Sequence, residues 1–222
     1  MSSQHSIGSM NQLADAFDES RITPDMVTRL RHPDFLAQMT LLLSGLATVV
    51  RASFKLSCSE ALNVAEFVGN NWSVWKGPAD GNGLDGKEYC VSDPDVVDFE
   101  RIVLETHLKK SDNGRIHGEE KMRRARAGKN QLLGGRSFLA LWKDWQKCKA
   151  EGKPEESVLE KLRRAKKIGD VICFFGLPLR NPIGIRCVLY LSFGGRGWYW
   201  DCNWLGDDWN ADIPSASLAS VK

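Results

Sequence analysis

Four residue types are missing from the last quarter of this 222-residue chain. Residues 171–221 contain no lysine, glutamate, glutamine or methionine, whereas residues 1–170 contain 36 of these residues. The four acids of the C-terminal stretch are all aspartate, and its three bases are all arginine. Strands disfavour lysine and glutamate, but that preference does not explain the missing glutamine and methionine. The bias indicates a cause other than the fold.

Signals for export, membrane insertion and metal binding are also missing. The N-terminus is polar and lacks an apolar segment typical of a signal peptide. The longest apolar run, residues 41–50, is about half the length that spans a bilayer. Six scattered cysteines form no CxxC pair, and the four histidines are not placed to complete a zinc site. The sequence therefore predicts a cytoplasmic protein with reduced thiols, no metal and no membrane insertion, which would need a non-standard route to be displayed on a surface.

Motifs for nucleotide binding and hydrolysis are absent as well. The chain contains no GxGxxG after a strand, no GxxxxGK[ST], no HExxH and no GxSxG. The HGEE run at 117–120 offers a histidine and two carboxylates, but acids at a helix start commonly complement the helix dipole. The glycine-rich run at 193–197 joins two expected strands, with no helix N-terminus to bind a phosphate. We therefore expect no catalytic residue and no cofactor.

Charge is distributed unevenly along the chain. Residues 101–170 carry 19 Lys and Arg against 10 Asp and Glu, whereas residues 1–100 carry 7 against 14. Basic helices at 121–136 and 161–167 could bind nucleic acid, or could simply be solvated helix faces. In the first reading, nearby indoles would stack on bases, and the contacts would come from Arg123, Arg124, Arg126, Arg163 and Arg164.

Hydrophobic periodicity predicts an α+β protein in two parts, a helical region over 1–45 with a disordered start and a larger domain over 46–222. A β-branched run predicts a strand over 47–57, and Ser57 with Glu60 resembles a helix capping box. Residues 93–110 fit a helix or a strand equally well. Further helices are expected over 116–131 and 137–151, followed by strands at 171–180, 186–193 and 197–205.

Half of the chain's eight tryptophans lie in the run GWYWDCNWLGDDWN at 197–210. Because residues two apart in a strand share a face, Trp198, Trp200, Cys202 and Trp204 should point one way, and Tyr199, Asp201 and Asn203 the other. Indoles bury large apolar areas and can anchor a sheet. The opposite face would then tolerate almost any side chain. Cys202 departs from the pattern: either it turns inward, or a bulge shifts the register there.

The residues between the tryptophans fit a genetic explanation of the bias. An asparagine codon whose two adenines are randomised becomes any codon that ends in a pyrimidine. Such codons encode Asn, Asp, Gly, Ile, Arg, Cys and Tyr, but never Lys, Glu, Gln, Met or Trp. The tryptophan codon contains no adenine, so the indoles would stay fixed while their neighbours vary.

The segment from VICFFGLPLR to DIPSASLAS at 171–220 resembles the variable region of diversity-generating retroelement target proteins. It is most similar to the hypothetical variable proteins of candidate-phyla bacteria, in which a W-N-W-N-Y-N-W-L template is rewritten by an adenine-mutagenic reverse transcriptase. The run IHGEEKMRRARAGKNQLLGGRSFLALWKDWQK is similar to two helices upstream in that family. The resemblance covers about half of the chain, and is specific at the C-terminus.

This resemblance implies a C-type lectin-like fold, a small twisted antiparallel sheet with flanking helices that displays variable side chains. The fixed scaffold residues would be Trp198, Trp200, Trp204 and Trp209. The variable, ligand-binding positions would be Ile183, Ile185, Arg186, Cys187, Tyr199, Asp201, Cys202, Asn203, Asp207, Asp208, Asn210, Asp212 and Ile213.

The function implied is non-enzymatic binding of varied ligands, such as proteins or cell-surface molecules. Nucleic-acid binding by the basic helices is the alternative. C-type lectin-like folds also include enzymes of the formylglycine-generating type, whose sites resemble closely spaced cysteine pairs near the C-terminus. Cys187 and Cys202 are fifteen residues apart, which disfavours that reading.

Overall fold

The computed structural model describes residues 54–75 and 93–220, which belong to one compact unit running from Ala52 to Lys222. The helical region expected at 1–45, and the expected strand before residue 54, lie outside the described residues. Within the described ranges, no helix is long and apolar enough to cross a membrane.

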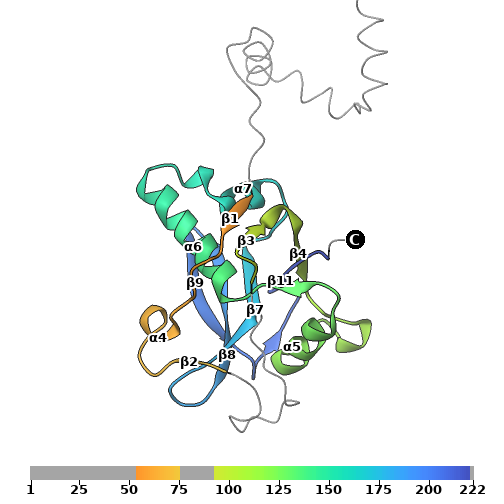
Figure 1. Ribbon diagram of the computed structural model, residues 1–222. Coiled ribbons are helices and arrows are strands. Elements are labelled where there is room, and N and C mark those ends of the chain that lie inside the picture. Colours follow the sequence, from red (N-terminus) through yellow and green to blue (C-terminus); the bar gives the residue numbers. More distant parts are fainter. Residues whose placement is uncertain (1–53, 76–92, 221–222) are drawn as a thin grey trace, which may run out of the picture. The chain divides into compact units, whose positions relative to one another are not determined.

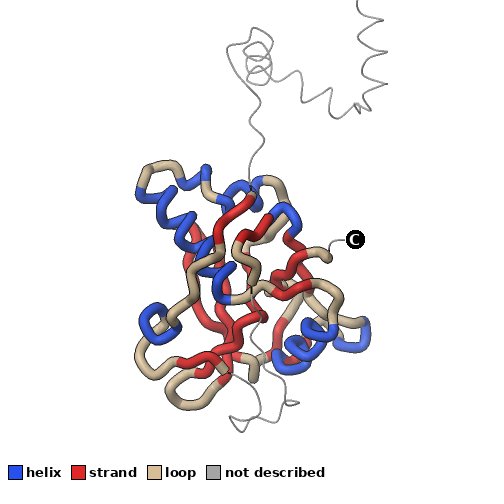
Figure 2. The backbone as a smooth tube through the Cα atoms, in the orientation of Figure 1, coloured by secondary structure: helices blue, strands red, loops and turns tan. Residues whose placement is uncertain are grey.

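The described residues form an α+β unit, as the sequence predicts (Figure 2). Its helices are α4 (Val64–Phe67), α5 (Gly118–Ala127), α6 (Gly135–Ala150) and α7 (Val158–Arg164). The longer strands are β4 (Ile102–Glu105), β7 (Val171–Arg180), β8 (Arg186–Gly194), β9 (Gly197–Trp204) and β11 (Ser215–Leu218). The shorter strands are β1 (Lys55–Ser57), β2 (Ser73–Val74), β3 (Val96–Asp98), β5 (Ile116–His117), β6 (Gln131–Leu132) and β10 (Asp208–Trp209).

The main sheet has the strand order β4-β11-β7-β8-β9, with β2 also paired to β7 and β6 to β11 (Figure 1). All of these pairs are antiparallel except β11 with β7. The last strand, β9, pairs with β8 alone among the described strands. One long edge of β9 is therefore left without a described strand partner, and β9 is the strand that carries the tryptophans.

Both faces of the sheet are covered by helices, because successive residues of β7 enter two different cores. Ile172 and Phe174 pack with side chains of α6 and α7 in a core that we call the α6 core. Cys173 and Phe175 pack with side chains of α5 in a second cluster, the α5 core. The five longest apolar contributors to the α5 core from other elements are Trp75, Met122, Leu205, Trp209 and Val188. The sheet thus separates two hydrophobic cores.

The helix expected over 137–151 is confirmed as α6. Phe138, Leu141 and Trp145 of the expected apolar stripe are buried, and Trp142 is half-buried. The helix begins after Gly134, which has no side chain to cap it, and Asp93 performs this role from a distant segment. Its carboxylate accepts hydrogen bonds from the backbone N–H groups of Gly134, Arg136 and Ser137. A carboxylate at this position complements the helix dipole.

The capping box proposed at Ser57 is wrong. Ser57 is the last residue of β1, where it pairs with Val96 of β3, so its backbone is extended and continues a ladder. The helix begins later, at Val64, and Asn63 caps it by accepting a hydrogen bond from the backbone N–H of Glu66. The ambiguous segment 93–110 forms the strands β3 and β4.

Candidate ligand-binding surface

The two faces of β9 follow the alternation expected from the sequence. Its register with β8 runs without interruption from Trp204 opposite Cys187 to Gly197 opposite Gly194. There is consequently no bulge in this pair, and Cys202 points to the same side as Trp198 and Trp200. The register shift in this part of the sheet lies between β7 and β8, beyond Cys173.

The inward face of β9 packs on the α6 core. Trp198 is 3% exposed, and its indole N–H donates a hydrogen bond of 2.8 Å to Oε1 of the buried Glu160. The ring centroid of Trp200 lies 4.8 Å from that of Phe67 in α4. Cys202 is half-buried against the same core. Trp198 and Trp200 therefore act as scaffold, as the resemblance implies.

Trp204 does not fit the scaffold role expected for it. Its side chain is 48% exposed, because it is the last residue of β9 and the strand ends before a helix can cover it. What Trp204 contributes to the structure is its carbonyl oxygen, which accepts a hydrogen bond of 3.1 Å from the indole N–H of Trp209.

The outward face of β9 is open to solvent toward the β8–β9 turn. Tyr199 is 49% exposed, Asp201 is exposed and Asn203 is half-buried. On β8, Tyr190 lies opposite Asp201. Burial, together with the negative charge of nearby Asp201, raises the pKa of Tyr190 to about 12. The phenol is consequently uncharged near neutral pH, and this face presents two tyrosines beside one carboxylate.

The segment after β9 continues this surface. Trp209 is completely buried in the α5 core, with its ring centroid 5.1 Å from that of Phe175. Ile213 is half-buried against the same core. The expected variable positions between and before them are exposed: Asp207, Asp208, Asn210 and Asp212. Because Val188 and Tyr190 also contact this core, the segment lies on the sheet face that carries Tyr199 and Asp201.

The connection between β7 and β8 adjoins the end of β9. Ile183 is 80% exposed and Ile185 is half-buried. The side-chain oxygen of Asn181 accepts hydrogen bonds from the backbone N–H groups of both isoleucines, at 3.1 and 2.8 Å. The N–H of Leu205 donates to the carbonyl oxygen of Arg186 at 2.9 Å. These contacts bring the upstream group of expected variable residues next to the downstream group.

Two expected ligand-binding residues are not free to contact a ligand. Cys187 is completely buried, because it is on the β8 face that packs into the structure opposite Trp204. Arg186 is half-buried, and its guanidinium forms an ion pair of 2.5 Å with Glu119. Burial raises the pKa of Glu119, whereas the charge of Arg186 opposes that rise. Both residues contribute to packing and pairing rather than to an open surface.

Contacts from α5 hold this surface by its main chain. The backbone N–H of Gly118 donates to the carbonyl oxygen of Asp207 at 2.9 Å. A Cβ atom at position 118 would lie 2.6 Å from the carbonyl oxygen of Leu205, so only glycine permits this approach. Lys121, which is completely buried, donates from Nζ to the carbonyl oxygen of Ile213.

The arginines of the nucleic-acid alternative are largely engaged within the protein. Arg123 binds the Glu120 carboxylate in a bidentate pair with both distances at 2.6 Å. Arg124 donates to Glu120 and Asp112, and these arginine hydrogen bonds lower the pKa values of Glu120 and Asp112 to about 2. Such pairs leave less positive charge for phosphate groups than the sequence suggests.

The described residues also contain two groupings of nucleophilic side chains. Burial raises the pKa of Cys187 to about 11 and that of Cys202 to about 12, which opposes thiolate formation. Ser215 Oγ lies 2.6 Å from Nε2 of His107, a contact that sequence reasoning missed because 108 positions separate the residues. Ser215 is completely buried, so a substrate cannot reach this hydroxyl.

Comparisons with known protein families, curated proteins and solved structures found no match. Among the described residues, no group of three or more His, Cys, Asp or Glu side chains could hold a metal ion.

Proposed function

We propose that this chain is a non-enzymatic ligand-binding protein whose C-terminal surface is diversified by a retroelement. The observation that carries the proposal is the way in which the scaffold holds that surface. Gly118, Lys121 and Asn181 lie outside the expected variable positions, and each makes a hydrogen bond to a main-chain atom of such a position. A main-chain N–H or C=O is present whichever side chain the position carries.

This arrangement separates the shape of the surface from its chemistry. The side chains of Ile183, Tyr199 and Asp201 are exposed, while the strand ladder or Asn181 fixes their backbone. A substitution at these positions therefore changes what the surface binds with little effect on folding. A diversified protein needs this separation, since every variant must fold.

We propose that the α+β unit is a C-type lectin-like domain. The support is its small antiparallel sheet with helices on both faces (Figure 1), and the position of the tryptophan-rich strand at one end of the strand order. The present surface combines Tyr199 with short polar residues, which is a composition typical of protein-recognition loops. We therefore propose a protein or another cell-surface molecule as its ligand.

The DNA beside the coding sequence tests the diversification directly. We expect a near-copy of the 3′ end that differs mainly at adenines, next to a reverse transcriptase gene. Sequencing of the same locus in a growing population should show substitutions at the codons of Tyr199, Asp201 and Asn210, and none at the codons of Trp198 and Trp209. A locus without the repeat and without a reverse transcriptase gene would refute the proposal.

A further inference from the structure

A second cavity lies away from the variable face, between the turn of the β8–β9 hairpin and the helices α6 and α7. It has a volume of about 320 Å³, at the lower end of the range for small-molecule sites. Its wall combines aromatic and charged side chains, which are Trp145, Phe193, Lys149, Arg163, Arg164, Arg196, Glu155 and Glu160.

The aromatic part of the wall is rigid. Trp145 is 2% exposed, and Gly197 fits against it so closely that a Cβ atom at 197 would lie 2.7 Å from Cζ2 of the indole. The backbone of Gly197 has φ of +110°, a conformation that other residues rarely adopt. Phe193 is held by Trp198 at a centroid distance of 5.6 Å and by the guanidinium of Arg163, which lies 3.6 Å from the ring centroid.

The charged part of the wall has an excess of positive charge, four cationic side chains against two carboxylates. Glu160 is already engaged, because it accepts from Trp198 at 2.8 Å and pairs with Arg163 at 3.3 Å. The side chains of Lys149 and Arg196, in contrast, form no hydrogen bond or ion pair with any described residue, although Lys149 lies 4.7 Å from the ring centroid of Trp145. Nε of Arg163 is buried without a hydrogen-bond partner.

We propose that this cavity binds a small organic anion, in which a phosphate-like group is attached to an apolar or aromatic body. Lys149, Arg163 and Arg196 would bind the anionic group, because charge-assisted hydrogen bonds to phosphate are strong. Trp145 and Phe193 would contact the apolar body. None of these five residues is among the expected variable positions, so the site would stay constant while the variable surface changes, and it does not depend on the proposed function.

The probe for this site is phenyl phosphate, and phenol and inorganic phosphate serve as its two halves. Titration calorimetry of the full chain at constant ionic strength should show binding of phenyl phosphate, weaker binding of inorganic phosphate and none of phenol. Lys149→Gln and Arg196→Gln should each weaken binding of phenyl phosphate about tenfold, the loss expected for one charged hydrogen bond.

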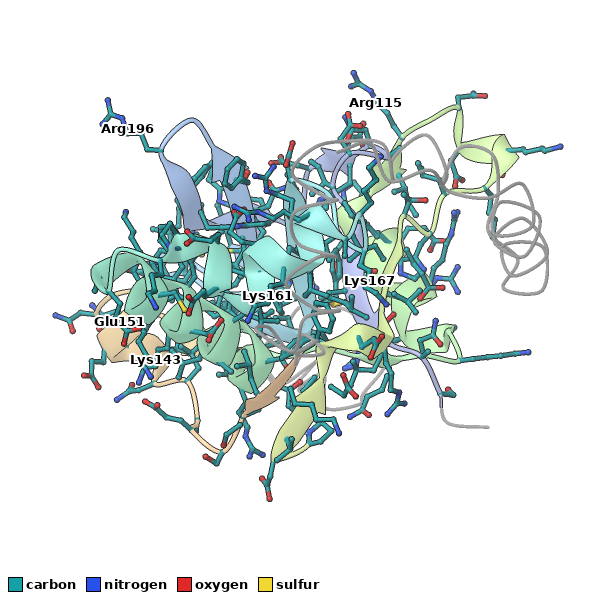
Figure 3. All side chains as sticks on the ribbon, turned by 90° about the horizontal axis from the view of Figure 1, so that it is seen from above. Arg115, Lys143, Glu151, Lys161, Lys167 and Arg196 are labelled. Carbon is teal, nitrogen blue, oxygen red and sulfur yellow. The ribbon has the colours of Figure 1, made fainter. Side chains whose placement is uncertain are left out.

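Arg115→Gln is the matched control, because Arg115 is also an exposed arginine but lies on a different part of the chain from Arg196 (Figure 3). This variant should bind as the unchanged protein does. Thermal unfolding should be the same for all three variants, since each substitution is at an exposed side chain. Equal weakening by Arg115→Gln, or no binding of phenyl phosphate at millimolar concentration, would overturn the proposal.

Discussion

The ammonium group of Lys121 donates a hydrogen bond to the carbonyl oxygen of Ile213, 92 positions later in the chain. The ammonium also lies 4.8 Å from the ring centroid of Trp209 and 5.4 Å from that of Phe175. A completely buried lysine thus connects α5 to the segment that carries Asp207 to Ile213. Because it binds a carbonyl oxygen, the connection does not depend on which side chain occupies position 213.

Lys121 should make stability depend on pH in a defined window. Burial lowers its pKa from 10.5 to about 8 in the folded protein. Between these values the unfolded chain binds the proton and the folded chain does not, so the free energy of unfolding should rise with pH. Below pH 8 both states are protonated, and the full cost of burying the charge is present.

The difference in unfolding free energy between the unchanged protein and Lys121→Met isolates this effect from other titrating groups. From pH 8 to pH 10.5 it should shift in favour of the unchanged protein by up to about 3 kcal/mol. Urea unfolding of both proteins at several pH values measures it. A difference that stays constant over this range would show that Lys121 has an ordinary pKa in the folded state.

The two faces of β9 should differ sharply in their sensitivity to truncation. Trp198→Ala should reduce the free energy of unfolding by about 3 to 5 kcal/mol, as the loss of a large buried aromatic does. It also leaves the buried Glu160 without its indole donor. Tyr199→Ala, one residue away on the exposed face, should cost under about 1 kcal/mol. Comparable losses in chemical denaturation would contradict the assignment of the faces.

Trp204 separates identity from position as the cause of a fixed tryptophan. If every indole of this run were scaffold, Trp204→Ala would destabilise the protein as much as Trp198→Ala does. Because Trp204 is 48% exposed and contributes its carbonyl oxygen to Trp209, we expect a cost under about 1 kcal/mol. Its exposed indole next to Ile183 and Asp207 would instead affect ligand binding, which the same variant can be used to measure.

The regular elements of this fold were largely predictable from the sequence. The helix α6 and the strands β7, β8 and β9 follow from apolar periodicity and turn residues, which are local signals. The outward positions of Tyr199 and Asp201 follow from the alternation along β9. The helix α4 was misplaced because a serine followed three residues later by a glutamate occurs outside helices too, and here the pairing of Ser57 with Val96 decides its conformation.

The errors within the candidate site come from contacts between distant segments. No local pattern indicates that Glu119 lies beside Arg186, or that Trp204 extends beyond the helices that cover Trp198 and Trp200. The anchoring of Ile213 by Lys121 was equally invisible, since a lysine between a glutamate and a methionine on a basic helix suggests a solvated side chain. Residues whose role depends on a partner far along the chain required the structure.

The pair formed by Arg186 and Glu119 gives the last prediction, which concerns the limits of diversification. Both side chains are about four-fifths buried, at 16% and 21% exposed, so removing one of them leaves a buried charge without its partner. Arg186→Ala should therefore destabilise the protein, and Arg186→Ala with Glu119→Ala should cost less than the sum of the single changes. We expect a coupling of about 1 kcal/mol or more in a double-mutant cycle. Additive costs would instead mean that position 186 can vary as freely as position 183, where the side chain of Ile183 is 80% exposed.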